Sequence, residues 1–150
     1  MKAELLKILR EAEDYVSGQQ LCDHFGVSRT AVWKVIRQLQ EEGYQIEAVK
    51  NRGYLLKKDA VPDVMTAPEI ISRLHSRWMG RNCIFLETVD STNNYLKRAA
   101  EDGAVNGTLA VAEEQTGGKG RRGRSWETPK GTNIAMTILL RPEIRPEHAS

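Results

Sequence analysis

The sequence predicts an α+β protein built from two modules. In the first third, apolar residues recur at helical spacing and a short alternating stretch follows, which predicts helices and then a hairpin. Beyond a charged segment that contains prolines, short apolar runs alternate with one helical stretch, which predicts strands around a helix. We therefore place the first domain at residues 1–58, a linker at residues 59–68 and the second domain at residues 69–150.

A helix-turn-helix is the first predicted motif. Gly26 fits the turn, and the small residue Cys22 stands four positions earlier, where two short helices must cross closely. Ser17 and Ser28 occupy the N-cap positions of the two helices, and the second helix is expected over residues 29–42. The predicted core of this domain is Leu5, Leu6, Ile8, Leu9, Leu21, Phe25, Val32, Val35, Ile36, Leu39, Ile46 and Leu55.

A hairpin after the second helix completes a winged helix-turn-helix, a DNA-binding fold. Gly43 ends the helix, residues 44–49 alternate like a strand, residues 50–53 supply a turn, and residues 54–56 pair back. Residues 1–60 hold ten Lys and Arg against nine Asp and Glu, so the placement of the cations, and not their number, predicts DNA binding. The predicted contacts with operator DNA are Ser28, Arg29, Thr30, Lys34, Arg37, Lys50 and Arg52.

Three residues near this face have two interpretations. Trp33 adjoins the apolar stripe of the second helix, so we expect it to pack beside the core, and the alternative is a position on the DNA side. Lys57 and Lys58 follow the wing and are expected to be ordinary solvated side chains, with phosphate contact as the alternative.

A segment rich in glycine and cations dominates the second domain. Residues 117–124 are four glycines and four cations, and Trp126 follows. Glycines let the backbone approach a ligand, and guanidinium groups offer donors for phosphate or carboxylate oxygens. The direct interpretation is a flexible anion-binding loop, and the alternative is a solvated basic loop or a nucleic-acid-binding tail. Neither a dinucleotide-binding turn nor a Walker motif fits, because no apolar helix follows and glycine comes after Lys119.

Two further polar segments stand on either side of this loop in the sequence. D-S-T-N-N at residues 90–94 enters a helical stretch with Ser91 at its N-cap, and P-K-G-T-N at residues 129–133 leads into the apolar run 134–140. With E-E-Q-T-G-G-K-G-R-R-G-R-S-W between them, this region resembles the first half of the catalytic domain of a biotin protein ligase. The preceding winged helix is similar to that of the bifunctional ligases that double as biotin operon repressors.

The resemblance implies a class II synthetase-like mixed α/β ligase domain. Such a ligase converts biotin and ATP, with Mg²⁺ expected alongside ATP, into biotinyl-5′-adenylate. It then transfers biotin to a lysine of the biotin carboxyl carrier protein of a carboxylase. The resemblance also implies repression through operator DNA and a homodimer of the adenylate-bound protein. The implied ligands of biotin and its adenylate are Ser91, Thr92, Asn93, Gln115, Gly118, Lys119, Gly120, Arg121, Arg122, Arg124 and Trp126.

Alternatives stay open for three of these residues and for the function. Ser91 and Thr92 would also fit a plain N-cap, and Trp126 would also fit the core. No tryptophan here stands between Lys and Pro, as the family's K-W-P-N-D type segment requires for its essential lysine. We therefore expect no catalytic residue in this chain and an incomplete catalytic domain without the family's small C-terminal barrel. The alternative function is a stand-alone winged-helix regulator with a non-catalytic basic effector segment.

Composition excludes several other classes of protein. The chain is 40% hydrophobic and 28% charged, and no run approaches the ~20 apolar residues that cross a bilayer. The acidic N-terminal region does not resemble a signal or transit peptide. The two cysteines and three histidines lack metal-ligand spacing. We therefore expect a reduced, cytoplasmic protein with no membrane association and no metal site.

Overall fold

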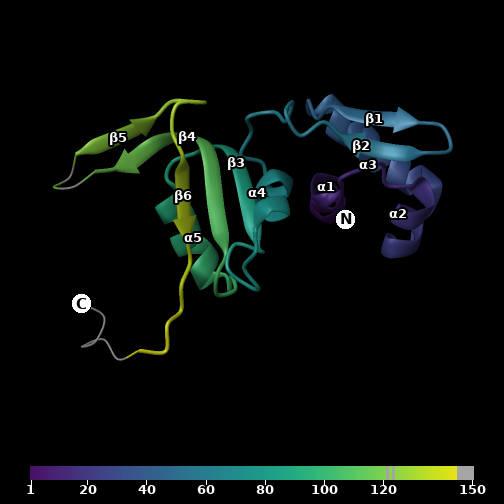
Figure 1. Cartoon of the computed structure of the whole chain (residues 1–150). Coiled ribbons are helices and arrows are strands. Elements are labelled where there is room, and N and C mark those ends of the chain that lie inside the picture. The colour runs from purple at the N-terminus through teal and green to yellow at the C-terminus, as the bar shows by residue number, and fades with distance from the viewer. Residues whose placement is uncertain (121, 123, 145–150) are drawn as a thin grey trace. The chain divides into compact units, whose positions relative to one another are not determined.

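The computed structural model describes residues 1–120, 122 and 124–144, which fall into two compact units. Unit 1 is Met1–Val64 and unit 2 is Met65–Ser150, so the boundary lies inside the segment 59–68 that we predicted as a linker. Unit 1 contains helices and a hairpin, and unit 2 contains a four-stranded sheet with helices (Figure 1). The predicted α+β class is confirmed.

The helices of unit 1 are α1 (Lys2–Glu11), α2 (Gly18–Phe25) and α3 (Arg29–Glu41). Ser17 Oγ accepts a hydrogen bond from the Gln20 backbone N–H at 3.1 Å, and the Gln20 side chain accepts one from the Ser17 N–H at 2.9 Å. Ser28 Oγ accepts from the Ala31 N–H at 3.3 Å. Gly26 ends α2 in the left-handed conformation at φ 63°. Both predicted N-caps and the turn glycine are confirmed.

The wing is an antiparallel hairpin of β1 (Ile46–Val49) and β2 (Gly53–Leu56). Val16, between α1 and α2, forms an isolated β-bridge with Tyr54 through two backbone hydrogen bonds of 2.9 Å. Gly53 has φ +119°, and a side-chain carbon at this position would overlap the Val16 carbonyl group. The wing is therefore joined to the connection between α1 and α2, and this joint requires glycine at position 53.

The core of unit 1 follows the predicted apolar set with two corrections. Leu56 is only 2% exposed and Leu55 is half-buried, because alternate residues of a strand face opposite sides and Leu56 is the one that faces the core. The expectation that Trp33 packs beside the core is wrong, because its side chain is 52% exposed. The buried stripe of α3 consists of Val32, Val35, Ile36 and Leu39.

Unit 2 contains α4 (Ala67–Arg73), β3 (Cys83–Val89), α5 (Thr92–Glu101), β4 (Leu109–Lys119), β5 (Ser125–Thr128) and β6 (Ala135–Ile138). β4 runs parallel to β3 along one edge. Along its other edge it pairs antiparallel with β6 in its first half and with β5 in its second half. α5 packs against β4 and β6, and α4 packs against β3 (Figure 1). The buried hydrophobic residues of β4 are Leu109, Ala110, Val111 and Ala112.

Three elements of unit 2 differ from the sequence prediction. β4 continues to Lys119, into the segment that we expected to be a flexible loop, and β5 was not expected at all. α4 lies partly in the predicted linker, where Pro68 stands in its first turn, a position in which proline is compatible with a helix. No helix among the residues that the structure describes is long and apolar enough to cross a lipid bilayer.

Candidate functional site

The first turn of α5 supplies buried polar groups to unit 2. Ser91 is the N-cap residue, but its side chain makes no capping hydrogen bond in the described structure. Ser91 is 4% exposed and Thr92 is 3% exposed. A polar side chain buried at a helix start without capping the helix is available for another partner. The plain N-cap alternative therefore does not account for the Ser91 hydroxyl.

A hydrogen-bond network connects this turn to three strands. The Thr92 backbone N–H and Oγ1 both donate to Gln115 Oε1 on β4, at 2.8 Å and 3.0 Å. Thr137 Oγ1 on β6 lies 2.9 Å from Thr92 Oγ1 and 2.8 Å from Asn93 Oδ1. Gln115 Nε2 lies 3.5 Å from Thr128 Oγ1 on β5. Thr92 and Asn93 and the distant Gln115, which lies more than 20 positions later in the sequence, therefore form one polar cluster, and the buried Ser91 precedes it directly in the chain.

The geometry of the network fixes which groups remain for a ligand. The Gln115 carbonyl oxygen accepts two hydrogen bonds from Thr92, so its amide nitrogen faces the opposite way, toward Thr128. The Asn93 carbonyl oxygen accepts from Thr137, which leaves the Asn93 amide N–H groups as donors. Preorganised amide and hydroxyl groups of this kind suit a small neutral ligand with its own N–H and C=O groups.

Asp90 holds the turn between β3 and α5 in place. Its carboxylate accepts from Asn94 Nδ2 at 3.0 Å and from Arg98 Nη2 at 3.2 Å. The hydrogen bond from Asn94, then those from Arg98 and the Ser91 N–H, hold the pKa of Asp90 well below its usual range. The Asp90 backbone carbonyl accepts from the Gly117 N–H on β4 at 2.8 Å. The polar turn and the start of the glycine-rich segment are therefore directly connected.

The glycine-rich segment forms a hairpin at the described residues. Gly118 pairs with Trp126 and Lys119 with Ser125, and the Gly120 N–H donates to the Arg124 carbonyl at 2.7 Å. Gly118 is buried, and a side-chain carbon there would overlap the Trp126 carbonyl oxygen. Both ends of the segment that we expected to be a flexible loop therefore belong to paired strands.

The cations of this hairpin are accessible. Lys119, Arg122 and Arg124 are exposed, and Trp126 is 58% exposed, so the alternative of core packing for Trp126 does not hold in this structure. Arg122 has φ 60° in the left-handed region. Arg121 was also predicted as a ligand residue, and it lies outside the described residues.

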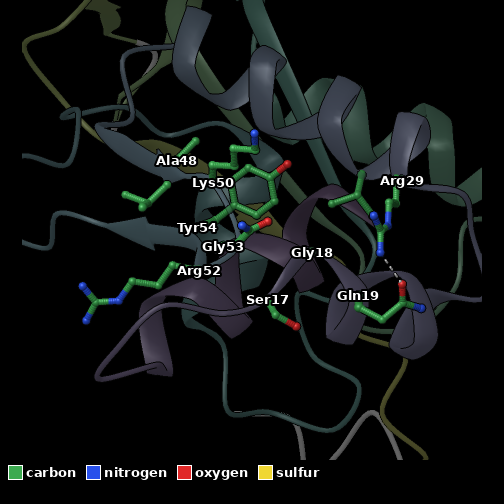
Figure 2. Close-up of a pocket in the computed structure, with 12 residues that line it drawn as sticks. Ser17, Gly18, Gln19, Arg29, Ala48, Lys50, Arg52, Gly53 and Tyr54 are labelled. Carbon is green, nitrogen blue, oxygen red and sulfur yellow. Dashed lines mark hydrogen bonds between the residues drawn. The ribbon is translucent and has the colours of Figure 1, made fainter.

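Unit 1 carries a second candidate site. A groove of about 430 Å³ lies between the start of α2, the start of α3 and the wing residues 48–54 (Figure 2). Arg29 lies at one side of this groove, where its guanidinium donates to Gln19 Oε1 at 3.0 Å. Lys50 lines the groove from the wing. Ser28 acts as the N-cap of α3, and its neighbours Arg29 and Thr30 are exposed, as are Lys34 and Arg37 further along the helix.

Arg52 differs from the other predicted DNA contacts. Its side chain points away from Arg29 in Figure 2 and forms an ion pair with Asp14 at 3.1 Å. Its guanidinium carbon lies 4.1 Å from the centroid of the Tyr15 ring. Tyr15 in turn has a pKa raised chiefly by a hydrogen bond to Glu47 on β1. Arg52 therefore joins the wing to the segment after α1, in addition to any contact with phosphate.

Two residues of the polar cluster were not predicted from the sequence. Thr128 and Thr137 each contribute a hydroxyl group from a strand. Thr137 is the only hydroxyl residue in the otherwise apolar run 134–140, and that interruption was the available signal. No group of three or more His, Cys, Asp or Glu residues in the described part of the chain is arranged to hold a metal ion.

Comparison with known families matches both units. A model described as HTH domain matches residues 2–55, and a model described as Biotin/lipoate A/B protein ligase family matches residues 85–150. The second match contains the polar cluster and the glycine-rich hairpin.

Comparison with individual proteins covers almost the whole chain. A protein of Bacillus spizizenii named Bifunctional ligase/repressor BirA is 39% identical over 145 residues, which are 96% of this chain and 44% of the relative. The protein of that name from Escherichia coli is 34% identical over 97% of this chain and 43% of its own length. The Biotin--[acetyl-CoA-carboxylase] ligase of Paracoccus denitrificans is 43% identical over 58 residues, which are 39% of this chain and 23% of that ligase. The chain therefore spans less than half the length of these relatives.

Proposed function

Because this chain is a homologue of the bifunctional ligase/repressors along 96% of its length, we propose that it forms the DNA-binding module and the first part of the ligand site of a biotin protein ligase. The observation that carries the ligase function is the polar cluster beside the cationic hairpin, inside the region that matches the ligase family. That match favours a ligase over a stand-alone regulator with a basic effector segment.

The polar cluster would bind the ureido ring of biotin. A ureido group has one carbonyl oxygen and two N–H groups, and the cluster presents amide donors from Asn93 and Gln115 together with the Ser91 hydroxyl. Thr92 would act by orienting the Gln115 amide, because it supplies both hydrogen bonds to Gln115 Oε1. A preorganised site of this kind rejects analogues that lack the matching polar groups.

The cationic hairpin would bind the anionic part of the reactants. In the first step, an oxygen of the biotin carboxylate would form a bond to the α-phosphorus of ATP, and pyrophosphate would leave. The cations Lys119, Arg122 and Arg124, with Arg121 as a further candidate, would offset the repulsion between the two anions, and Gly120 would leave room beside them. Gly118 would allow close approach of the backbone, and the exposed Trp126 ring would cover the adenine.

The second step would transfer biotin to protein. A lysine amine of a biotin carboxyl carrier protein would attack the activated carbonyl carbon, AMP would leave, and the amine would lose a proton. Mg²⁺ would accompany ATP, bound to its phosphate oxygens. The essential lysine of the family has no counterpart within these 150 residues, so this chain by itself would bind ligand without completing the reaction.

Unit 1 would bind operator DNA through α3 and the wing. Thr30 and Lys34 on the exposed side of α3 would approach the bases, with Arg29 beside them, and Lys50 would contact phosphate. Occupation of the ligand site by biotinyl-adenylate would favour a homodimer that matches a two-fold symmetric operator. The protein would thus repress transcription in response to biotin.

Adenylate synthesis tests the ligase function directly. The full-length product of the coding sequence would be incubated with ATP labelled at the α-phosphate and with either biotin or lipoate, since the family includes ligases for both acids. We expect labelled biotinyl-adenylate and no lipoyl-adenylate. Labelled product with lipoate alone, or with neither acid, would contradict the proposal.

A further inference from the structure

Trp33 is a large aromatic residue on the solvent side of α3. Its side chain is 52% exposed, whereas the residues on either side of it along the buried stripe, Val32 and Val35, are almost fully buried. About half of this side chain therefore stays in water in the free protein, where its apolar surface contributes no burial free energy. The position is therefore best explained by a partner that covers the ring.

The surroundings of the ring are cationic. Arg37, one helical turn later, places its guanidinium carbon 5.8 Å from the centroid of the Trp33 ring. Lys34 is exposed next to it. No acidic residue occurs in α3 before Glu41, in its last turn. This charge favours a polyanion over a protein surface with mixed charges.

The fold identifies the polyanion as duplex DNA. α3 is the second helix of the helix-turn-helix, and this helix lies in the major groove in proteins that use the motif. The apolar group that base edges present in the major groove is the C5-methyl group of thymine. An exposed indole ring on this helix has the chemistry to contact that group.

We propose that Trp33 is a specificity-determining residue that contacts a thymine C5-methyl group in the major groove. This inference rests on the DNA-binding function proposed above. Arg37, held over the same ring, directs its charge toward the adjacent phosphates. Trp33 thus supplies sequence preference, while the cations around it supply affinity for any duplex.

The test removes the methyl group from the DNA and the ring from the protein. The probe is a duplex selected from a random library by the wild-type 150-residue chain, with each thymine replaced in turn by deoxyuracil, which lacks only the C5-methyl group. For the wild-type chain we expect one replacement in each half-site to weaken binding by about fourfold, the effect of one buried methyl or methylene group. Trp33→Ala should bind more weakly overall and should no longer distinguish thymine from uracil at that position. Trp78→Ala, at a tryptophan 50% exposed in unit 2, is the matched control and should respond to uracil as the wild type does.

Two outcomes would overturn the inference. A Trp33→Ala variant that binds the selected duplex and keeps the full response to uracil would leave the DNA-binding function standing and remove the role of Trp33. If the wild-type chain selects no duplex, the DNA-binding function itself fails, and this inference fails with it.

A second measurement covers the case in which Trp33→Ala does not fold. In the variant Trp78→Phe/Trp126→Phe, Trp33 is the only tryptophan. Addition of the selected duplex should reduce the quenching of Trp33 fluorescence by acrylamide. Unchanged quenching in the bound complex would show that Trp33 does not contact the DNA.

Discussion

The two units bury different kinds of side chain. Among the described residues, twelve of the eighteen buried hydrophobic residues lie in unit 1, and all six buried polar or charged residues lie in unit 2. Burial of apolar surface stabilises a fold, whereas a buried polar group costs free energy unless it is hydrogen-bonded. The interior of unit 1 therefore consists of apolar side chains that stabilise the fold. The interior of unit 2 also holds polar side chains, and three of them, Ser91, Thr92 and Thr128, belong to the region proposed as the ligand site.

The largest effect should come from the apolar core of unit 1. Leu39→Ala removes a fully buried side chain and should lower the free energy of unfolding of unit 1 by about 2–5 kcal/mol. Urea denaturation would follow Trp33 fluorescence in a Trp78→Phe/Trp126→Phe background and Trp78 fluorescence in a Trp33→Phe/Trp126→Phe background. Only the Trp33 transition should shift. A matching shift of the Trp78 transition would show that the units unfold together.

A substitution in the polar cluster should weaken ligand binding. Gln115→Leu leaves Thr92 without its acceptor and should weaken biotin binding by about 1–3 kcal/mol, measured by titration calorimetry on the full-length protein. Thr116→Val is the matched control, because Thr116 is exposed and next to Gln115. Equal losses in both variants would indicate a general disturbance of β4. Retained affinity in Gln115→Leu would remove Gln115 from the site.

The wing offers a smaller and more specific comparison. Lys50 takes part in none of the ion pairs found in the described structure, whereas Arg52 is paired with Asp14. Lys50→Ala should therefore reduce the slope of log affinity for DNA against log salt by about 1, the effect of one lost phosphate contact. Arg52→Ala should weaken binding with less change in slope, because it loosens the wing. Equal changes in slope would assign both residues to phosphate.

The smallest effect should be the loss at acid pH of the stability that Asp90 contributes. Because hydrogen bonds hold its folded pKa below the ordinary value of 3.8, its contribution to stability is complete above that value. It is lost as the pH falls through the lowered pKa. The difference in melting temperature between wild type and Asp90→Asn, reported by Trp78, should therefore shrink from pH 6 to pH 2. Asp102→Asn, exposed in the same unit, is the control. A difference that stays constant with pH would contradict this assignment.

Local features of the fold could be predicted from the sequence, and features that depend on distant contacts could not. Ser17, Ser28 and Gly26 act within four residues of the groups that they satisfy, so their roles were visible in the sequence. The bond from Arg52 to Asp14 spans 38 residues, and no local pattern indicates it. Helical periodicity identified the buried stripe of α3. It did not decide whether Trp33, which adjoins that stripe, faces the core or the solvent.

The candidate site shows the same division. The resemblance to biotin protein ligases implied a site that contains Ser91, Thr92, Asn93 and Gln115, and the structure joins Thr92 directly to Gln115. β5 was missed because it is only four residues long and forms by pairing with the second half of β4, where the glycines indicated a loop. Thr128 was therefore missed as well, since its role depends on that pairing.

The irregular register between β4 and β5 constrains the number of residues in this part of the hairpin. From the pair Gln115 and Thr128 to the pair Gly118 and Trp126, β4 advances by three residues and β5 by two. One residue more or fewer in this interval would turn every later side chain of the strand to the opposite face. Lys119 would then change face relative to Gln115. Evolution of this hairpin is therefore free to exchange residues at its exposed positions, but the number of residues between Gln115 and Gly118 has to stay the same.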